Sequence, residues 1–172
     1  MTRRVSVRPA RVDDLDAIVE IYNHYVLHSP TTFDVDPVTV EERRRWFEHY
    51  SPEGPYRLLV AQKDGLPVGY ATSSLHRPKP AYRTSVETSI YLSPTVVGEG
   101  LGSLLYGELF RCLEGEALHR AYAGITLPNP ASLALHHRFG FRSVGIFQEV
   151  GFKHGRYWSV QWMEKDLDPG LG

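Results

Sequence analysis

Hydrophobic and polar positions along the chain predict strands and helices in alternation. Val5 and Val7 stand between polar neighbours, a spacing typical of a short strand. Apolar residues then recur at helical spacing behind Asp13 and Asp14, and acidic residues in a first turn suit the helix dipole. The segment from Thr39 to Glu42 has the form of a capping box and predicts a second helix. The apolar face of the first helix would consist of Leu15, Ile18, Val19, Tyr22 and Val26.

The rest of the chain continues this alternation. Further strands are expected at residues 56–62, 68–75, 83–92, 121–127, 142–150 and 157–165. A long helix follows the third of these, and Asn129-Pro130 opens another helix that Gly140 ends. This order predicts an α/β fold with a mixed sheet and helices on both faces. We expect a single domain over residues 1–166 and a frayed tail over 167–172.

A glycine-rich loop is the most informative motif. Residues 98–102 read Gly-Glu-Gly-Leu-Gly and lie between a predicted strand and a predicted helix. Such a loop directs free backbone N–H groups and a helix dipole at a bound anion, which favours a phosphate-bearing ligand. The spacing matches neither a Walker A loop nor a dinucleotide fingerprint. A tight turn without a ligand is the alternative, although three glycines in five residues exceed what a turn needs.

Composition removes several function classes. The 172 residues carry a net charge of −1, so no electrostatic footprint for nucleic acid is present. The single Cys112 excludes an internal disulfide framework and is expected to be a packing residue. No apolar stretch approaches the length of a membrane span, and the N-terminus has no apolar leader segment. We therefore expect a cytoplasmic protein without a nucleic-acid or membrane partner.

The element order and the loop together resemble the GNAT N-acetyltransferase superfamily. Residues 97–102, Val-Gly-Glu-Gly-Leu-Gly, match the pattern Gln/Arg-x-x-Gly-x-Gly/Ala that binds the pyrophosphate of acetyl-CoA in that family. Val97 departs from the usual Gln or Arg. The resemblance implies the GNAT acyl-CoA N-acyltransferase fold, with a mostly antiparallel sheet whose central strands splay apart to receive the pantetheine arm.

A narrower resemblance covers most of the chain and points to phosphinothricin N-acetyltransferases and their methionine sulfoximine relatives. It rests on residues 21–26 (Ile-Tyr-Asn-His-Tyr-Val), 82–87 (Tyr-Arg-Thr-Ser-Val-Glu) and 151–155 (Gly-Phe-Lys-His-Gly), on Thr32-Phe33, and on Leu127-Pro-Asn129, Leu135-His136, Gly140-Phe141 and Trp158. It implies direct transfer of acetyl from acetyl-CoA to the α-amine of a small amino-acid analogue. A protein N-terminus or polyamine substrate, and a non-catalytic acyl-CoA-binding protein, are the alternatives.

The resemblance also assigns roles to individual residues. Glu87 matches the catalytic glutamate and would act as general base, directly or through water, although the residues alone equally allow a strand-surface acid or a salt-bridge partner of Arg83. His136 would return a proton to the CoA thiolate with an imidazole near its natural pKa, whereas His137 is the weaker candidate. Asn129 would both cap its helix and contact the cofactor. The cofactor contacts implied are Thr88, Ser89, Ile90, Val97, Gly98, Glu99, Gly100, Leu101, Gly102, Ser103 and Asn129.

Substrate contacts are expected on two segments around the general base. The set comprises Phe33, His76, Arg77, Pro78, Arg83, Ser85, Val86 and Glu87. Either Arg77 or Arg83 would grip the carboxylate or phosphinate with its planar fork. The basic residues Lys153, His154 and Arg156 would form a solvated turn or approach the ligands. No metal is expected, and the resemblance implies a homodimer.

Overall fold

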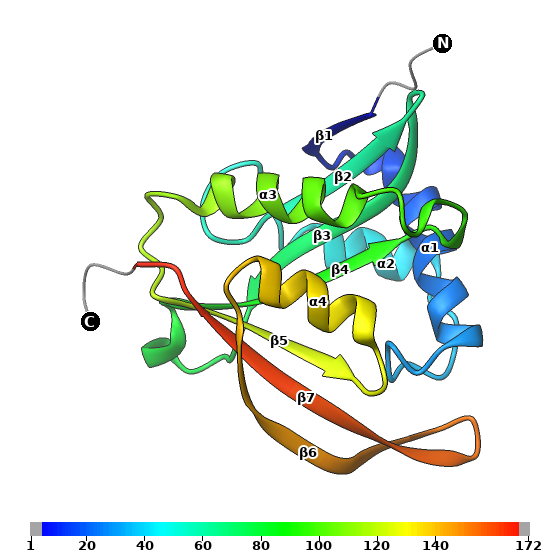
Figure 1. Cartoon of the computed structure of the whole chain (residues 1–172). Coiled ribbons are helices and arrows are strands. Elements are labelled where there is room, and N and C mark those ends of the chain that lie inside the picture. Colours follow the sequence, from blue (N-terminus) through cyan, green and yellow to red (C-terminus); the bar gives the residue numbers. More distant parts are fainter. Residues whose placement is uncertain (1–4, 169–172) are drawn as a thin grey trace.

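Seven strands form one mixed sheet in the order β1-β2-β3-β4-β5-β7-β6 in the computed structural model, which describes residues 5–168 (Figure 1). The strands are β1 (Val5–Pro9), β2 (Leu58–Lys63), β3 (Leu66–Leu75), β4 (Ser85–Leu92), β5 (Arg120–Thr126), β6 (Arg142–Lys153) and β7 (Arg156–Asp166). The α-helices are α1 (Leu15–His28), α2 (Val40–Phe47), α3 (Leu101–Leu113) and α4 (Pro130–Arg138). The predicted order of elements is confirmed. Within residues 5–168, no helix is long and apolar enough to cross a membrane.

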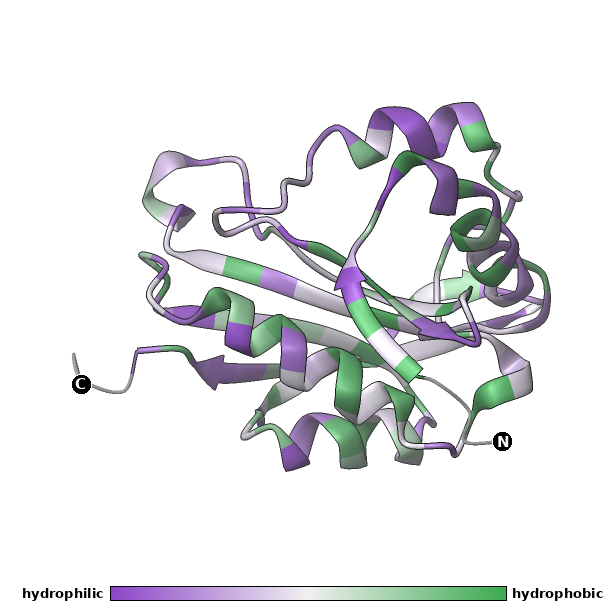
Figure 2. Ribbon diagram, turned by 90° about the horizontal axis from the view of Figure 1, so that it is seen from above, coloured by the Kyte–Doolittle hydropathy of each residue, from purple (hydrophilic) through white to green (hydrophobic). Residues whose placement is uncertain are grey.

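Each face of the sheet is covered by its own helices (Figure 2). Side chains alternate along β2, because successive residues of a strand point to opposite faces. Leu58 and Val60 pack with α1 and α2, whereas Leu59 and Ala61 pack with α3 and α4. The sheet is therefore buried on both sides, which explains why its central strands are so apolar.

Strands β4 and β5 part after a short paired segment, as the resemblance implied. They are the parallel pair, and their pairing covers only Ser85–Glu87 with Arg120–Tyr122. Both strands continue beyond that point, β4 to Leu92 and β5 to Thr126. Backbone groups of the parted segments are consequently not used for sheet pairing across this gap.

The C-terminal hairpin differs from the expectation. Strands β6 and β7 run up to a two-residue turn at His154 and Gly155, so the expected end of the strand at residue 150 is wrong. Gly151 lies inside β6. A glycine is required at this position, because the ring of Phe33 occupies the space where a side chain would stand: a Cβ there would lie 2.3 Å from Phe33 Cε2. At the start of the expected tail, the Leu167 N–H donates to the His119 carbonyl; residues 169–172 of that tail lie outside the described residues.

Lys153 ties the tip of this hairpin to the end of α1. Its side chain is 3% exposed, and its ammonium donates to the carbonyls of Tyr25 (3.4 Å), Ser29 (2.8 Å) and Thr32 (2.8 Å). The expectation of a solvated basic turn is therefore wrong for Lys153. A cation is well suited to the carbonyls at a helix C-terminus.

Replacing Lys153 with Met should destabilise the protein by about 1.5–3 kcal/mol, the range for hydrogen bonds to a charged group. The substitution keeps much of the aliphatic chain but leaves buried carbonyls without their donor. Urea unfolding of Lys153→Met, beside the exposed Lys79→Met as a control, measures the loss. Equal stability of the two variants would contradict this role.

Candidate active site

The glycine loop leaves an open cradle before the first turn of α3. Gly98 and Gly100 have φ of +88° and +81°, a region that side chains with a Cβ seldom adopt. A Cβ at either position would meet nothing within 4 Å, so the space above the loop is free. Gly102 serves packing instead, because its Cβ would lie 3.3 Å from Leu135 Cδ2 of α4. The cradle has the free N–H groups and the space that a phosphate requires.

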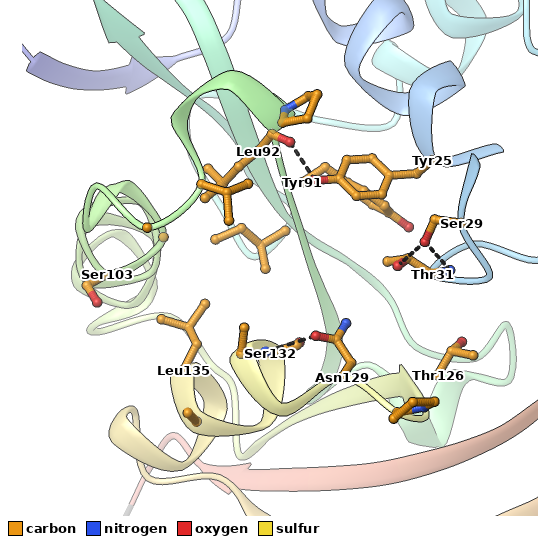
Figure 3. A pocket seen from close by; sticks show the side chains of 18 of the residues that line it. Tyr25, Ser29, Thr31, Tyr91, Leu92, Ser103, Thr126, Asn129, Ser132 and Leu135 are labelled. Atoms are coloured by element: carbon orange, nitrogen blue, oxygen red, sulfur yellow. Dashed lines mark hydrogen bonds between the residues drawn. The ribbon is translucent and has the colours of Figure 1, made fainter. Parts of the chain in front are cut away.

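A cavity of about 670 Å³ extends from this cradle between the start of α3, the end of β4 and helix α4 (Figure 3). Ser29 and Thr31, which follow α1, close its other side. Tyr25 joins the two walls by donating its hydroxyl to the Leu92 carbonyl over 2.6 Å. The expected cofactor residues that line the cavity are Ile90, Val97, Gly98, Gly100, Gly102, Ser103 and Asn129.

Two other expected cofactor residues, Leu101 and Glu99, do not line the cavity with their side chains. Leu101 is buried in the core at the start of α3, and Glu99 forms an ion pair with Lys63 over 2.5 Å. Their side chains do not line the cavity, which leaves only their backbone for a ligand. Asn129 caps α4 as expected, because its Oδ1 accepts from the Ser132 N–H over 3.1 Å.

Arg138 at the cavity mouth was missed in the sequence analysis. Its guanidinium donates to Ser103 Oγ over 2.9 Å and so bridges α4 to the first turn of α3. The signal was present: a basic residue in the last turn of the helix that Asn129 caps. Its position provides a cation beside the phosphate cradle.

A smaller cavity of about 50 Å³ occupies the gap between β4 and β5. Thr88, Ser89 and Ile90 line it from β4, together with Tyr106 of α3 and His136 of α4. His136 is 3% exposed, and its Nδ1 lies 2.7 Å from the Ser132 carbonyl. That nitrogen must carry the proton, so Nε2 accepts the Tyr106 hydroxyl over 2.8 Å.

Burial sets the charge of this pair. Desolvation lowers the pKa of His136 and raises the pKa of Tyr106. The expectation of an imidazole near its natural pKa is therefore wrong, and both groups are neutral at neutral pH. His137 instead points its Nδ1 at the Phe141 carbonyl over 3.2 Å.

Glu87 is the last residue of β4 that pairs with β5, and it lies opposite Tyr122. The predicted alternation is confirmed, since Val86 and Thr88 on either side of it are buried. Burial is the largest influence on Glu87 and raises the pKa of its carboxyl, while the charges of His76 and Arg77 oppose this rise. The raised pKa makes the carboxylate a stronger base than an ordinary glutamate.

Only some of the expected substrate residues lie close to Glu87. His76 lies beside Glu87, with Nδ1 3.6 Å from Oε2, and the charge of the exposed Arg77 acts on the same carboxyl. Pro78 and Arg83 are exposed, and Ser85 is half-buried at the start of β4. Val86 is fully buried against α3, so its side chain does not face the surface of the sheet that carries Glu87. None of these residues lines either cavity.

Among residues 5–168, no group of three or more His, Cys, Asp or Glu side chains is arranged to hold a metal ion. Arg156, the last of the basic hairpin residues, stacks on the Trp158 ring at 4.2 Å.

Comparisons with known proteins agree with this geometry. The family model of the acetyltransferase (GNAT) domain matches residues 7–162. Phosphinothricin N-acetyltransferase of Streptomyces coelicolor is 55% identical over 168 residues, which are 96% of this chain and 98% of that protein. L-methionine sulfoximine/L-methionine sulfone acetyltransferase of Pseudomonas paraeruginosa is 35% identical, over 95% of each chain. A Salmonella typhimurium acetyltransferase structure with its cofactor acetyl-CoA superposes with a TM-score of 0.92 at 34% identity, covering 98% of this chain and 96% of that one.

The fold and the site thus define an acyl-transferring enzyme, and the chain belongs to the GNAT acetyltransferase family. It is an N-acetyltransferase, as its relatives' names state for them. The GNAT fold expected from the sequence is confirmed.

Acetyl-CoA should stabilise wild-type protein by about 2.7 kcal/mol at a hundredfold excess over its Kd, because it binds only the folded state. Gly100→Ala should lose at least half of the resulting rise in melting temperature, since a Cβ would stand in the open cradle. Gly115→Ala is the matched control, because Gly115 also has a positive φ of +80° and free space. Thermal melts with and without acetyl-CoA measure both. Absence of any shift in the wild type, or equal losses in both variants, would refute the cradle.

Proposed function

We propose that this enzyme transfers acetyl from acetyl-CoA to the α-amine of a small amino-acid analogue such as L-phosphinothricin or methionine sulfoximine. The observation that carries the proposal is the parting of β4 and β5, which begins where Glu87 stands. The names of the relatives from Streptomyces coelicolor and Pseudomonas paraeruginosa support the substrate class.

The residues around the large cavity fit acetyl-CoA. The N–H groups at the start of α3 and the cation of Arg138 suit its phosphates, and the unused backbone groups of 88–90 suit its peptide-like arm. Asn129 and Val97 lie on the same cavity. Acetyl-CoA supplies the activated acetyl group as a thioester, and the protein supplies position and proton transfer.

Glu87 removes the proton that blocks the amine. A small amino acid reaches the enzyme mainly as an ammonium at neutral pH, and an ammonium has no lone pair with which to attack a thioester. The carboxylate of Glu87 takes this proton, directly or through water, and the freed amine attacks the acetyl carbonyl. Burial, which raises the pKa of Glu87, favours this transfer.

The His136–Tyr106 pair returns a proton to the leaving sulfur. Both side chains line the gap between β4 and β5, and their hydrogen bond of 2.8 Å joins them. Each proton has an acceptor in the free enzyme: the Tyr106 hydroxyl donates to His136 Nε2, and the His136 Nδ1–H donates to the Ser132 carbonyl. The Tyr106 hydroxyl turns from His136 Nε2 to the sulfur and gives it the proton, and the phenolate that this leaves takes a proton from solvent after CoA departs.

The amino-acid carboxylate is held by Arg77 or Arg83, and Phe33, Pro78 and Ser85 shape the pocket around it. Both guanidinium groups are exposed in the free enzyme and thus available to a planar anion.

We also propose that the enzyme forms a homodimer, is located in the cytoplasm and serves in detoxification. Strand β6 forms an edge of the sheet and exposes Val144, Ile146, Phe147, Val150 and Phe152. An apolar edge strand of this length favours pairing with a second copy. Sedimentation velocity measures whether the protein has twice its 19.5 kDa monomer mass.

Glu87→Gln should lower kcat/KM about 10²–10⁴-fold, the usual contribution of a positioned general base. Gln keeps the size of the side chain but accepts no proton. In the wild type, kcat/KM should fall as the pH drops through the raised pKa of Glu87, because the protonated carboxyl is no base. Steady-state assays of thiol release across pH measure both effects.

Glu20→Gln on the exposed side of α1 is the control and should retain activity. Part of the activity lost by Glu87→Gln should return at high pH, where more of the amine is already free. Near-normal activity at neutral pH would remove Glu87 from the mechanism.

Arg77→Ala and Arg83→Ala separate the two candidates for the carboxylate clamp. At least one should lose roughly 1.5–3 kcal/mol of amino-acid binding, the range for a hydrogen bond to a charged group. Its KM for the amino acid should rise while the affinity for acetyl-CoA stays. Unchanged kinetics in both variants would exclude this clamp.

A further inference from the structure

His76 follows directly after β3 and is held between aromatic rings beside Glu87. Its imidazole stacks on Tyr122 of β5, with ring centres 4.5 Å apart and planes 21° apart. Tyr82, in the short 3-10 helix Pro80–Tyr82, meets it edge-on at 5.9 Å. Only 12% of the His76 side chain is exposed. Two neighbouring elements thus restrict its rotation and hold its ring edge toward the carboxylate.

The Nδ1 atom of this ring is buried and has no hydrogen-bond partner among residues 5–168. A buried polar nitrogen without a partner is costly, so its position requires an explanation. The polar group that it faces is Glu87 Oε2, 3.6 Å away. An unprotonated Nδ1 would set its lone pair against the lone pairs of a carboxylate. A proton on Nδ1 turns this repulsion into attraction and needs only a small approach to form a hydrogen bond.

We propose that His76 is a positioning residue for Glu87, whose Oε2 accepts the His76 Nδ1–H so that Oε1 remains for the proton of the amine. The proposal rests on the proposed role of Glu87 as the general base. It changes the assignment of His76, which the sequence analysis placed in direct contact with the substrate. The proton moves from the ammonium nitrogen to Oε1, and the Nδ1–H bond is retained throughout.

Few charged groups compete for this carboxylate. His76 and Arg77 come from the segment after β3, and both lower the pKa of Glu87 against the larger effect of burial. Tyr122 of β5 and Tyr82 are the other titratable side chains packed on the imidazole. Loss of His76 should therefore raise the pKa of Glu87 further, since burial would be opposed by Arg77 alone.

Three substitutions separate the hydrogen bond from the ring packing. His76→Phe keeps an aromatic ring for Tyr122 but has no donor. His76→Asn carries an amide N–H close to the position of Nδ1, whereas His76→Gln carries it close to the position of Nε2. The Asn and Gln variants are similar in polarity, so their contrast tests the proposal even if the Phe variant does not fold.

The pH dependence of kcat and kcat/KM is measured for each variant with phosphinothricin and acetyl-CoA. In His76→Phe and His76→Gln, kcat should fall about 3–10-fold, and the acid limb of the profile should move up by about 0.5–1 pH unit. The amino-acid KM should change less than twofold. His76→Asn should stay within about twofold of the wild type. Equal profiles for Asn and Gln, or a rise in KM without a shifted acid limb, would overturn the proposal.

A second readout does not depend on the substrate. The pKa of Glu87 is measured by carbon NMR of labelled glutamate carboxyls, with the signal assigned by its loss in Glu87→Gln. This pKa should rise in His76→Phe and His76→Gln but not in His76→Asn. A wild type that acetylates no amine while showing this pattern would refute the proposed function and leave the pairing intact. An unchanged pKa in all three variants would refute the pairing itself.

Discussion

The arrangement of the site depends on one constraint, the short pairing of β4 with β5. The two strands share only three residue pairs, from Ser85–Arg120 to Glu87–Tyr122, and then separate. Beyond that point the backbone of β4 is hydrogen-bonded on its β3 side but borders a cavity on the other. Unused backbone groups cannot stay buried without a partner, so the gap suits a ligand that offers amides of its own.

The same strand serves both faces of this gap. Glu87 and Thr88 are neighbours in sequence and point to opposite sides of the sheet, because side chains alternate along a strand. Glu87 lies with His76 on one side, while Thr88 Oγ1 lies 3.4 Å from the Tyr106 hydroxyl on the other. The proposed proton acceptor, Glu87, and the proposed proton donor, Tyr106, therefore lie on opposite sides of the sheet.

Much of this arrangement could be predicted from the sequence, because its signals are local. Hydrophobic periodicity gave the order of strands and helices, the glycine spacing gave the cradle, and alternation placed Glu87 opposite the buried Val86 and Thr88. What could not be predicted depends on contacts between distant segments. The buried ammonium of Lys153 is explained by carbonyls more than a hundred residues away in the sequence. The lowered pKa of His136 depends on the burial of its side chain. The continuation of β6 through Gly151 could not be predicted either, because the Phe33 ring that requires a glycine there lies far away in the sequence.

Amide hydrogen exchange with and without acetyl-CoA tests the central claim most directly. The account predicts that acetyl-CoA slows exchange in residues 88–92 of β4 and in residues 98–104 of the glycine loop and α3, because the ligand takes up the backbone groups of the gap and the cradle. Exchange in β1, at the far edge of the sheet, should not change. Protection confined to other segments, with β4 and the loop exchanging as in the free enzyme, would contradict the account.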